Sequence, residues 1–232
     1  MLLGGLQKIT LIDYPSKVAA IVFTIGCNFR CCFCYNTRLV NPELFSKDDV
    51  ILEEDFFSFL KSRVGKLDAV VITGGEPTLH NDLESFILKI KEMGFLVKLD
   101  TNGTRPDVIK KLIEKKLVDY IAMDIKNDLL GWNYEKIVKV NIDMALLMES
   151  IKIIISSGVD YEFRTTVAPG ISKENILNIA HHIHGAKKYY LQKFQDLDVL
   201  DNACKEEKWL SEDELDDIAK EVRAFVGECK VR

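Results

Sequence analysis

Three cysteines lie close together near the start of the chain, at the spacing C-x3-C-x2-C (Cys27, Cys31 and Cys34). Cysteine thiolates bind zinc and iron–sulfur clusters. Three thiolates in one loop, with no obvious fourth, can hold a four-iron cluster and leave one iron open to another ligand. Phe29 and Phe33 lie between the cysteines, and apolar neighbours of this kind shield a cluster from water. The spacing therefore predicts a reactive iron–sulfur centre.

Two simpler interpretations of the same loop stay open. A structural zinc site closes with four ligands, and an ordinary electron-transfer cluster binds four cysteines. The candidates for a fourth ligand are Cys32, His80, Cys204 and Cys229. Cys32 lies between two expected ligands, where chain stiffness makes it a poor ligand for the same metal. Cys204 and Cys229 lie in polar surroundings without a partner motif, so we expect neither to have a role.

The composition narrows the class of protein. The chain has 232 residues, of which 47% are hydrophobic and 29% charged, as in soluble globular proteins. A net charge of -5 provides no basic stripe for nucleic acid. We find no signal-peptide pattern and no apolar run of the roughly 20 residues that span a membrane. A cytoplasmic protein is expected, and cysteine clusters in a reducing cytosol usually bind metal.

Apolar, β-branched runs alternate with amphipathic stretches along nearly the whole chain. The runs that predict strands are Val18–Thr24, Ala69–Thr73, Leu96–Asp100, Tyr120–Ile125, Tyr161–Val167 and Tyr189–Phe194. The stretches that predict helices are Glu53–Val64, Asp82–Met93, Pro106–Lys115, Asp143–Ser157, Lys173–His184 and Ser211–Val226. Ser211 followed by Glu214 has the pattern of a capping box. Gly94 and Gly158 stand where helices are expected to end.

Strands separated by helices form a parallel sheet with right-handed crossovers. Six such units are too few for an eight-stranded barrel, so the pattern favours an α/β fold with an open, six-stranded partial (β/α)6 barrel and outer helices. A doubly wound sheet is the alternative, because local pattern does not determine strand order. Without a linker or repeat we expect one domain over residues 1–232, with its core at about 17–194 and a C-terminal helix at about 211–226.

Polar and glycine residues follow the predicted strands, at the edge where ligands bind in such folds. Gly74 and Gly75 suit a backbone that passes close to a ligand, although a plain turn would also use them. Asp100 and Asp124 end two strands, and Lys126 lies two residues further on. Arg164 lies in an apolar strand, where it needs an anion. That anion is either a ligand or a structural carboxylate.

These stretches together resemble the radical SAM superfamily, from about Gly5 to Phe194. The matching pieces are the cysteine loop, Thr73-Gly74-Gly75-Glu76-Pro77, Asp100-Thr101-Asn102-Gly103, Asp124-Ile125-Lys126 and Arg164 before Val167-Ala168-Pro169-Gly170. The later pieces resemble the subset that activates glycyl radical enzymes. The opening GGLQKITLIDYPSKVAAIVF, continuing into TIGCNFRCCFC, is similar to the activating proteins of anaerobic ribonucleotide reductase.

The resemblance implies a [4Fe-4S] cluster on Cys27, Cys31 and Cys34, with S-adenosylmethionine (SAM) chelating its open iron. The cluster and SAM supply the chemistry, and no further catalytic residue is expected. Matching residues near SAM are Asn36, Gly74, Gly75, Glu76, Pro77, Asp100, Asn102, Asp124, Lys126, Arg164 and Gln192. Glu76 is expected to organise its turn rather than to touch substrate, and Asn102-Gly103 to form a turn in which the asparagine tolerates positive φ. A monovalent cation beside the aspartates is also implied.

The function implied is reductive cleavage of SAM and formation of a glycyl radical on a partner enzyme. Anaerobic ribonucleotide reductase is the favoured partner, and an enzyme like pyruvate formate-lyase is the second. An electron donor such as flavodoxin or ferredoxin is required. The alternatives are radical SAM chemistry on a small molecule and a zinc or electron-transfer module without enzyme activity.

Overall fold

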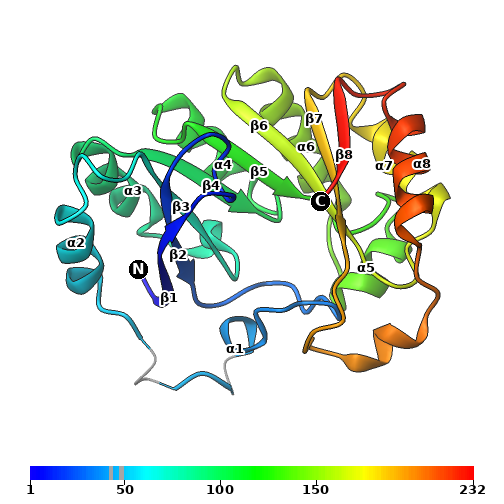
Figure 1. The fold of residues 1–232 in the computed structure, drawn as a ribbon, viewed down its shortest axis with the longest axis horizontal. Coiled ribbons are helices and arrows are strands. Elements are labelled where there is room, and N and C mark those ends of the chain that lie inside the picture. Colours follow the sequence, from blue (N-terminus) through cyan, green and yellow to red (C-terminus); the bar gives the residue numbers. More distant parts are fainter. Residues whose placement is uncertain (42–43, 47–49) are drawn as a thin grey trace. The chain divides into compact units, whose positions relative to one another are not determined.

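The computed structural model describes residues 1–41, 44–46 and 50–232, and its elements are labelled in Figure 1. The chain divides into two compact units that are interleaved in sequence. The first unit comprises Met1–Asn28, Asn36–Thr101 and Asp107–Ile121; the second comprises Phe29–Tyr35, Asn102–Pro106 and Ala122–Arg232. The single domain expected over residues 1–232 stays a prediction.

Four strands build the first unit. Strand β1 (Leu3–Thr10) pairs antiparallel with β2 (Ala19–Thr24), which pairs parallel with β3 (Ala69–Gly74). Strand β4 (Leu96–Thr101) lies parallel on the other side of β3. The register places Thr24 opposite Gly74. The cysteine loop, which follows β2, therefore begins beside the glycine pair Gly74–Gly75 at the end of β3.

The helices of the first unit are α1 (Thr37–Val40), α2 (Glu53–Lys61), the 3-10 helix η3 (Pro77–Leu79), α3 (Leu83–Glu92) and α4 (Pro106–Glu114). Three of them, α2, α3 and α4, begin and end close to predicted positions, whereas α1 and the 3-10 helix η3 were not predicted. The apolar face of α3 buries Phe86, Ile87 and Ile90. The ring of Phe86 stacks on that of Phe56 in α2, with centroids 5.2 Å apart. Gly94 follows α3 with φ 88°, as expected for a residue that ends a helix.

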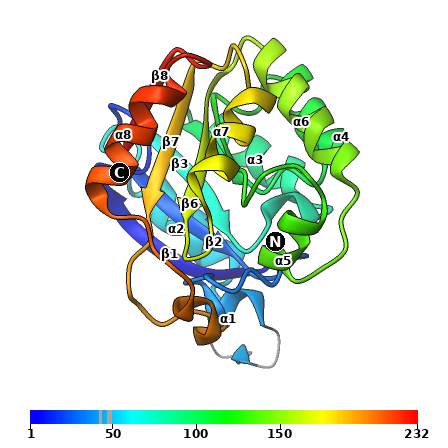
Figure 2. The same ribbon diagram turned by 90° about the vertical axis from the view of Figure 1, so that its right-hand side faces the viewer.

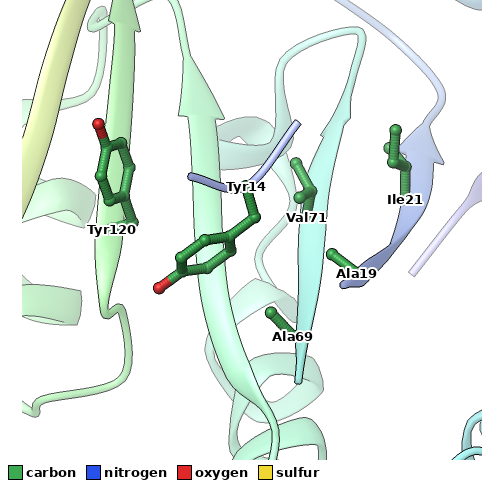
Figure 3. Packing of buried hydrophobic residues seen from close by; sticks show 6 residues of the cluster. All are labelled: Tyr14, Ala19, Ile21, Ala69, Val71 and Tyr120. Atoms are coloured by element: carbon green, nitrogen blue, oxygen red, sulfur yellow. The ribbon is translucent and has the colours of Figure 1, made fainter. Parts of the chain in front are cut away.

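A cluster of buried side chains covers the amino-terminal halves of β2 and β3 (Figure 3). Small residues, Ala19 and Ala69, leave room for two tyrosines. The rings of Tyr14 and Tyr120 are tilted by 54°, with centroids 5.7 Å apart. Aromatic pairs in this arrangement stabilise a core beyond the area that they bury. The IDYP segment of the sequence therefore contributes to the core through Tyr14.

Strand β5 (Tyr120–Asp124) runs from the first unit into the second, which contains β6 (Asp160–Val167), β7 (Lys188–Lys193) and β8 (Glu228–Val231). Strands β6, β7 and β8 are parallel neighbours in that order. The helices are α5 (Trp132–Val138), α6 (Met144–Ser156), α7 (Lys173–His182), the 3-10 helix η4 (Asn202–Glu206) and α8 (Glu212–Val222). Helix α8 packs against β8 and α7 (Figure 2).

The expected α/β class, with parallel strands followed by helices, is confirmed. All six predicted strands and six predicted helices are present, with small shifts at their ends. The capping box of Ser211 and Glu214 is also confirmed, as is the start of α4 at Pro106. Strands β1 and β8 and the short helices α1 and α5 were not predicted. Among the described residues, no helix has the length and apolar character needed to span a membrane.

Candidate functional site

The turn after β3 lies directly against the backbone that leads into the cysteine loop. The amide of Gly75 donates to the carbonyl oxygen of Thr24 at 2.9 Å, and that of Glu76 donates to Gly26 at 2.8 Å. A Cβ atom on Gly75 would lie 1.9 Å from the carbonyl oxygen of Gly26. On Gly74, whose φ is 113°, it would lie 2.3 Å from the amide nitrogen of Thr24. Both glycines are therefore required by close packing of one backbone on another.

Glu76 is a buried carboxylate that holds this turn together. Its Oε1 accepts hydrogen bonds from the amide of Thr78 at 3.1 Å and from the hydroxyls of Thr78 and Thr101 at 2.5 and 2.8 Å. Only 1% of its surface is exposed. Pro77, the first residue of η3, needs no amide partner. These contacts agree with the expectation that Glu76 organises the turn.

Two side chains form hydrogen bonds at the two ends of the cysteine loop, both within the first unit. The Nδ2 of Asn36 donates to the carbonyl oxygen of Gly74 at 2.9 Å. The Nε2 of His80 lies 3.0 Å from the carbonyl oxygen of Ile25, so this nitrogen carries the proton that is donated. Burial lowers the pKa of His80, which favours the neutral ring. His80 thus fixes the segment before Cys27 through the backbone.

Asp100, at the end of β4, forms an ion pair that the sequence analysis missed. The Nζ of Lys98 lies 2.8 Å from Oδ1 of Asp100, and only 1% of Lys98 is exposed. Its ammonium also lies 5.9 Å from the centre of the Tyr120 ring. The signal was present in the sequence, because residues two apart on a strand share a face. A lysine inside an apolar strand needs such a partner.

In the second unit, three predicted residues meet where the end of β5 lies beside the middle of β6. The Nε of Arg164 lies 2.8 Å from Oδ1 of Asp124, and the Nζ of Lys126 lies 3.1 Å from Oδ2. Burial disfavours the ionised carboxyl of Asp124, but the charges of Arg164 and Lys126 outweigh it and lower the pKa to about 2. Burial likewise opposes the charge of Lys126, yet Asp124 raises its pKa above the ordinary value. All three groups are therefore charged near neutral pH.

The second half of the cysteine loop is attached to the second unit by its backbone. The amides of Arg30 and Cys32 donate to the carbonyl oxygens of Val138 and Ile137, at the end of α5. The amide of Cys34 donates to the carbonyl oxygen of Cys31 at 3.0 Å, so these two predicted ligands share one turn. None of the six cysteines forms a disulfide.

Aromatic rings surround this half of the loop. The ring of Phe29 contacts Tyr134 of α5 edge-on, and the ammonium of Lys126 lies 5.8 Å from the centre of the Phe33 ring. Tyr35 stacks on Phe194 and accepts a hydrogen bond from the amide of Gln195 at 2.7 Å. Cysteines with apolar neighbours suit an iron–sulfur cluster, which prefers thiolate ligands shielded from water.

Asn102 lies in the turn after β4, and Gln192 lies on β7. The Oδ1 of Asn102 accepts from the amide and hydroxyl of Thr104, at 3.0 and 2.7 Å. The positive φ of this turn lies on Gly103, at 78°, rather than on Asn102. A Cβ atom on Gly103 would also lie 2.2 Å from Cε of Met123. Gln192, on β7, lies opposite Thr166 of β6.

The two remaining cysteines differ in their surroundings. Cys204 is half-buried and lines a cavity together with Cys32. Cys229 lies on β8 and is fully buried, although its sequence neighbours are polar. The sequence could not reveal either fact. Cys204 is far from Cys32 along the chain, and the polar neighbours of Cys229 give no sign that it is the buried residue of a strand.

The family model of the radical SAM superfamily matches residues 21–183. A protein of Methanocaldococcus jannaschii, provisionally named a glycyl-radical enzyme activating enzyme, is 36% identical over all of this chain and 95% of its own length. The GTP 3',8-cyclase of Helicobacter pylori strain J99 is 27% identical over 78% of this chain and 54% of its own.

Solved structures share the fold of this chain. Streptococcus suis SuiB bound to S-adenosylmethionine has a TM-score of 0.67 at 14% identity, over 91% of this chain and 49% of that protein. The structure of TYW1 with a lysine-pyruvate adduct has a TM-score of 0.60 at 18% identity, over 89% of this chain and 73% of that one. The chain thus spans about half the length of SuiB, and the likeness confirms the fold class alone.

Proposed function

The chain belongs to the radical SAM superfamily, and we propose that it is an enzyme that generates a glycyl radical on a partner enzyme. The observation that carries this proposal is the full-length similarity to the M. jannaschii protein, at 36% identity. Anaerobic ribonucleotide reductase is the favoured partner, on the resemblance of the segment that precedes Cys27. An enzyme like pyruvate formate-lyase is the second.

Cys27, Cys31 and Cys34 hold a [4Fe-4S] cluster in this proposal, with SAM at its open iron. When bound, the cluster supplies the electron that cleaves SAM. The turn that joins Cys31 to Cys34 supports this ligand set, and none of the three cysteines is used in a disulfide. The buried rings of Phe29 and Phe33 support it further, because they exclude water from the loop. In this proposal the protein holds the cluster and SAM in position and excludes water from them.

The charged group of Asp124, Lys126 and Arg164 suits the binding of the carboxylate of SAM. Asp124 is shared by two cations, Arg164 and Lys126. Arg164 also lies 4.0 Å from the buried Glu162, which pairs with Arg232 at 3.2 Å. The ammonium of Lys126 would attract an anionic ligand at this position. We assign that role to Lys126, with Asp124 and Arg164 as positioning residues.

The remaining predicted contacts with SAM stay predictions with different support. The backbone of Gly74–Pro77 adjoins Gly26, next to Cys27, which suits contact with the amino group of SAM. Asn36 orients the same turn through Gly74. Asp100 is paired with Lys98, and Asn102 Oδ1 is engaged within its own turn. The prediction for Gln192 is supported by its position near the end of β7. The prediction of a monovalent cation is supported by the family resemblance alone.

The test is anaerobic reconstitution of the full chain with iron and sulfide, followed by addition of SAM and a strong reductant. We expect formation of 5′-deoxyadenosine and, with anaerobic ribonucleotide reductase present, an organic radical seen by electron paramagnetic resonance. Flavodoxin or ferredoxin should replace the chemical reductant. No cleavage of SAM would contradict the enzyme proposal. A colourless protein with one zinc would instead favour a zinc module, and an iron protein inert towards SAM would favour an electron-transfer module.

A small-molecule substrate is a second candidate, favoured by the similarity to GTP 3',8-cyclase over 78% of the chain. The same assay separates the two functions. Cleavage of SAM that depends on GTP, without a radical on either glycyl radical enzyme, would favour the second candidate. Cleavage that yields a radical on the protein partner would favour the first.

A further inference from the structure

Tyr134 is a fully buried tyrosine of α5 that belongs neither to the charged group nor to the cysteine ligands. Its hydroxyl oxygen accepts a hydrogen bond from the backbone amide of Lys126 at 3.2 Å. Within the part of the chain that the structure describes, the hydroxyl hydrogen has no acceptor. A buried donor without an acceptor is costly. This hydrogen therefore indicates that another group binds beside it.

The ring of Tyr134 packs against the cysteine loop. It meets the ring of Phe29 edge-on, with centroids 6.1 Å apart and planes at 66°. One turn further along α5, the carbonyl oxygen of Val138 accepts from the amide of Arg30 at 2.9 Å. Phe29 and Arg30 lead directly into Cys31. Helix α5 thus fixes the segment that precedes this predicted ligand, and the ring of Tyr134 is part of that contact.

The surroundings of the hydroxyl are apolar on the side of the loop. The rings of Phe29 and Phe33 are both buried, and the ring of Phe33 lies 5.8 Å from the ammonium of Lys126. Water therefore competes little for a hydrogen bond at this place. Burial raises the pKa of Tyr134 above its ordinary value, so the hydroxyl keeps its hydrogen near neutral pH. The loop thus faces a neutral donor that is fixed in position.

We propose that the hydroxyl of Tyr134 donates a hydrogen bond to a sulfur of the iron–sulfur cluster. This inference rests on the proposed function, because it needs the cluster assigned to Cys27, Cys31 and Cys34. Hydrogen bonds to the sulfurs of a cluster help to set its reduction potential. A donor stabilises the reduced cluster more than the oxidised one, because the reduced cluster is more negative. Tyr134 therefore raises the potential at which the cluster accepts an electron.

The experiment compares Tyr134→Phe with the wild type, both reconstituted anaerobically with iron and sulfide in D₂O and reduced with dithionite. Phenylalanine keeps the ring that packs on Phe29 and removes only the hydroxyl. Electron–nuclear double resonance on the reduced cluster detects the deuterons close to it. We expect one deuteron coupling of the wild type to be lost in the variant. Because this coupling comes from the hydroxyl itself, it distinguishes a direct bond from a displacement of Lys126.

A redox titration followed by electron paramagnetic resonance gives the second readout. Loss of one hydrogen bond to a charged group should lower the ratio of reduced to oxidised cluster, at a fixed potential, about tenfold. For a one-electron couple this corresponds to a midpoint about 59 mV lower.

Tyr161→Phe is the matched control. The hydroxyl of Tyr161 likewise accepts from a backbone amide, that of Lys187 at 3.1 Å, and the residue is 2% exposed. It lies near the amino-terminal end of β6, whereas Lys126 follows the carboxyl end of β5. Both variants lose the same kind of hydrogen bond, so a purely structural role predicts similar losses of stability and unchanged cluster signals in both.

The outcomes separate this inference from the proposed function. Unchanged deuteron couplings in Tyr134→Phe would overturn the inference, even if that variant cleaves SAM. A wild-type protein that assembles no iron–sulfur cluster would overturn both the inference and the proposed function. A coupling that is lost in Tyr134→Phe and kept in Tyr161→Phe would support the inference, including in a protein that forms no glycyl radical.

Discussion

The guanidinium of Arg164 binds the carboxylate of Asp124, with 2.8 Å between Nε and Oδ1. The two residues come from the neighbouring strands β5 and β6. These strands are joined next to the ion pair, because the amide of Ile125 donates to the carbonyl oxygen of Arg164 at 2.8 Å. The anion that Arg164 needs is therefore supplied by the protein. Lys126, on the other oxygen of Asp124, is held between a fixed carboxylate and Phe33 of the cysteine loop. This relationship gives Lys126 a defined position before any ligand binds.

Replacing Lys126 should weaken SAM binding. Loss of a hydrogen bond between charged groups costs roughly 1.5–3 kcal/mol, so Lys126→Met should raise the Kd about 10- to 100-fold. Equilibrium dialysis of SAM against the reconstituted protein measures this. Lys136→Met is the matched control, because Lys136 is 63% exposed and pairs with Glu207 at 3.5 Å. Equal affinity of Lys126→Met and the control would contradict the assignment.

The stability of the protein should fall in acid through Asp124. Its folded pKa of about 2 lies below the ordinary 3.8, so its contribution is complete above the ordinary pKa and is lost as pH falls toward 2. The difference corresponds to roughly 2 kcal/mol. Denaturant unfolding of the wild type and Asp124→Asn should show a gap that narrows by about half between pH 5 and pH 3. A constant gap would mean that the pKa is not depressed.

Replacing Gly75 should destabilise the fold. In Gly75→Ala the new Cβ meets the backbone of Gly26 at 1.9 Å, and backbone cannot move aside as a side chain can. We expect a loss near the upper end of the roughly 1–3 kcal/mol typical of overpacking. Gly5→Ala is the control, because its nearest neighbour is the Phe23 side chain at 3.2 Å. Urea unfolding compares the two variants, and similar losses would count against the close backbone contact.

Lys98 should be more important for stability than for function. Lys98→Met leaves Asp100 without this partner in a buried position, which typically costs about 3–5 kcal/mol. The double variant Lys98→Met/Asp100→Asn should recover part of that loss, because no isolated charge remains. Thermal unfolding of the two single variants and the double variant tests the coupling. Strictly additive losses would show that the pair is not coupled.

Removing one predicted cluster ligand separates a reactive cluster from a structural metal. We expect Cys27→Ala to lose most of its bound iron and to keep its far-ultraviolet circular dichroism, because strands β2 and β3 pair independently of the loop. Cys229→Ala should keep both iron and fold. Iron analysis and circular dichroism after reconstitution provide the readouts. Unfolding of Cys27→Ala would instead favour a zinc site that holds the chain together.

Most elements of the fold were predictable, because buried strands and amphipathic helices leave periodic patterns. The two missed strands lack such patterns. Strand β1 contains two glycines and is largely unburied, and β8 has four residues of which one is buried. Short edge strands are defined by the neighbour they pair with, rather than by their own residues. Helix α5 was missed for a related reason, since it follows Gly131 at φ 72° without a side-chain cap.

The sequence by itself determined the cysteine spacing, the glycine turn and the order of the charged motifs along the chain. Only the tertiary structure decided which distant residues meet: it pairs Arg164 with Asp124 and places Cys204 and Cys32 at one cavity. The physical reason is that partners are chosen by distance in space and by burial, which makes an uncompensated charge costly. Residues 172 positions apart, such as Cys32 and Cys204, come together only when the second unit folds.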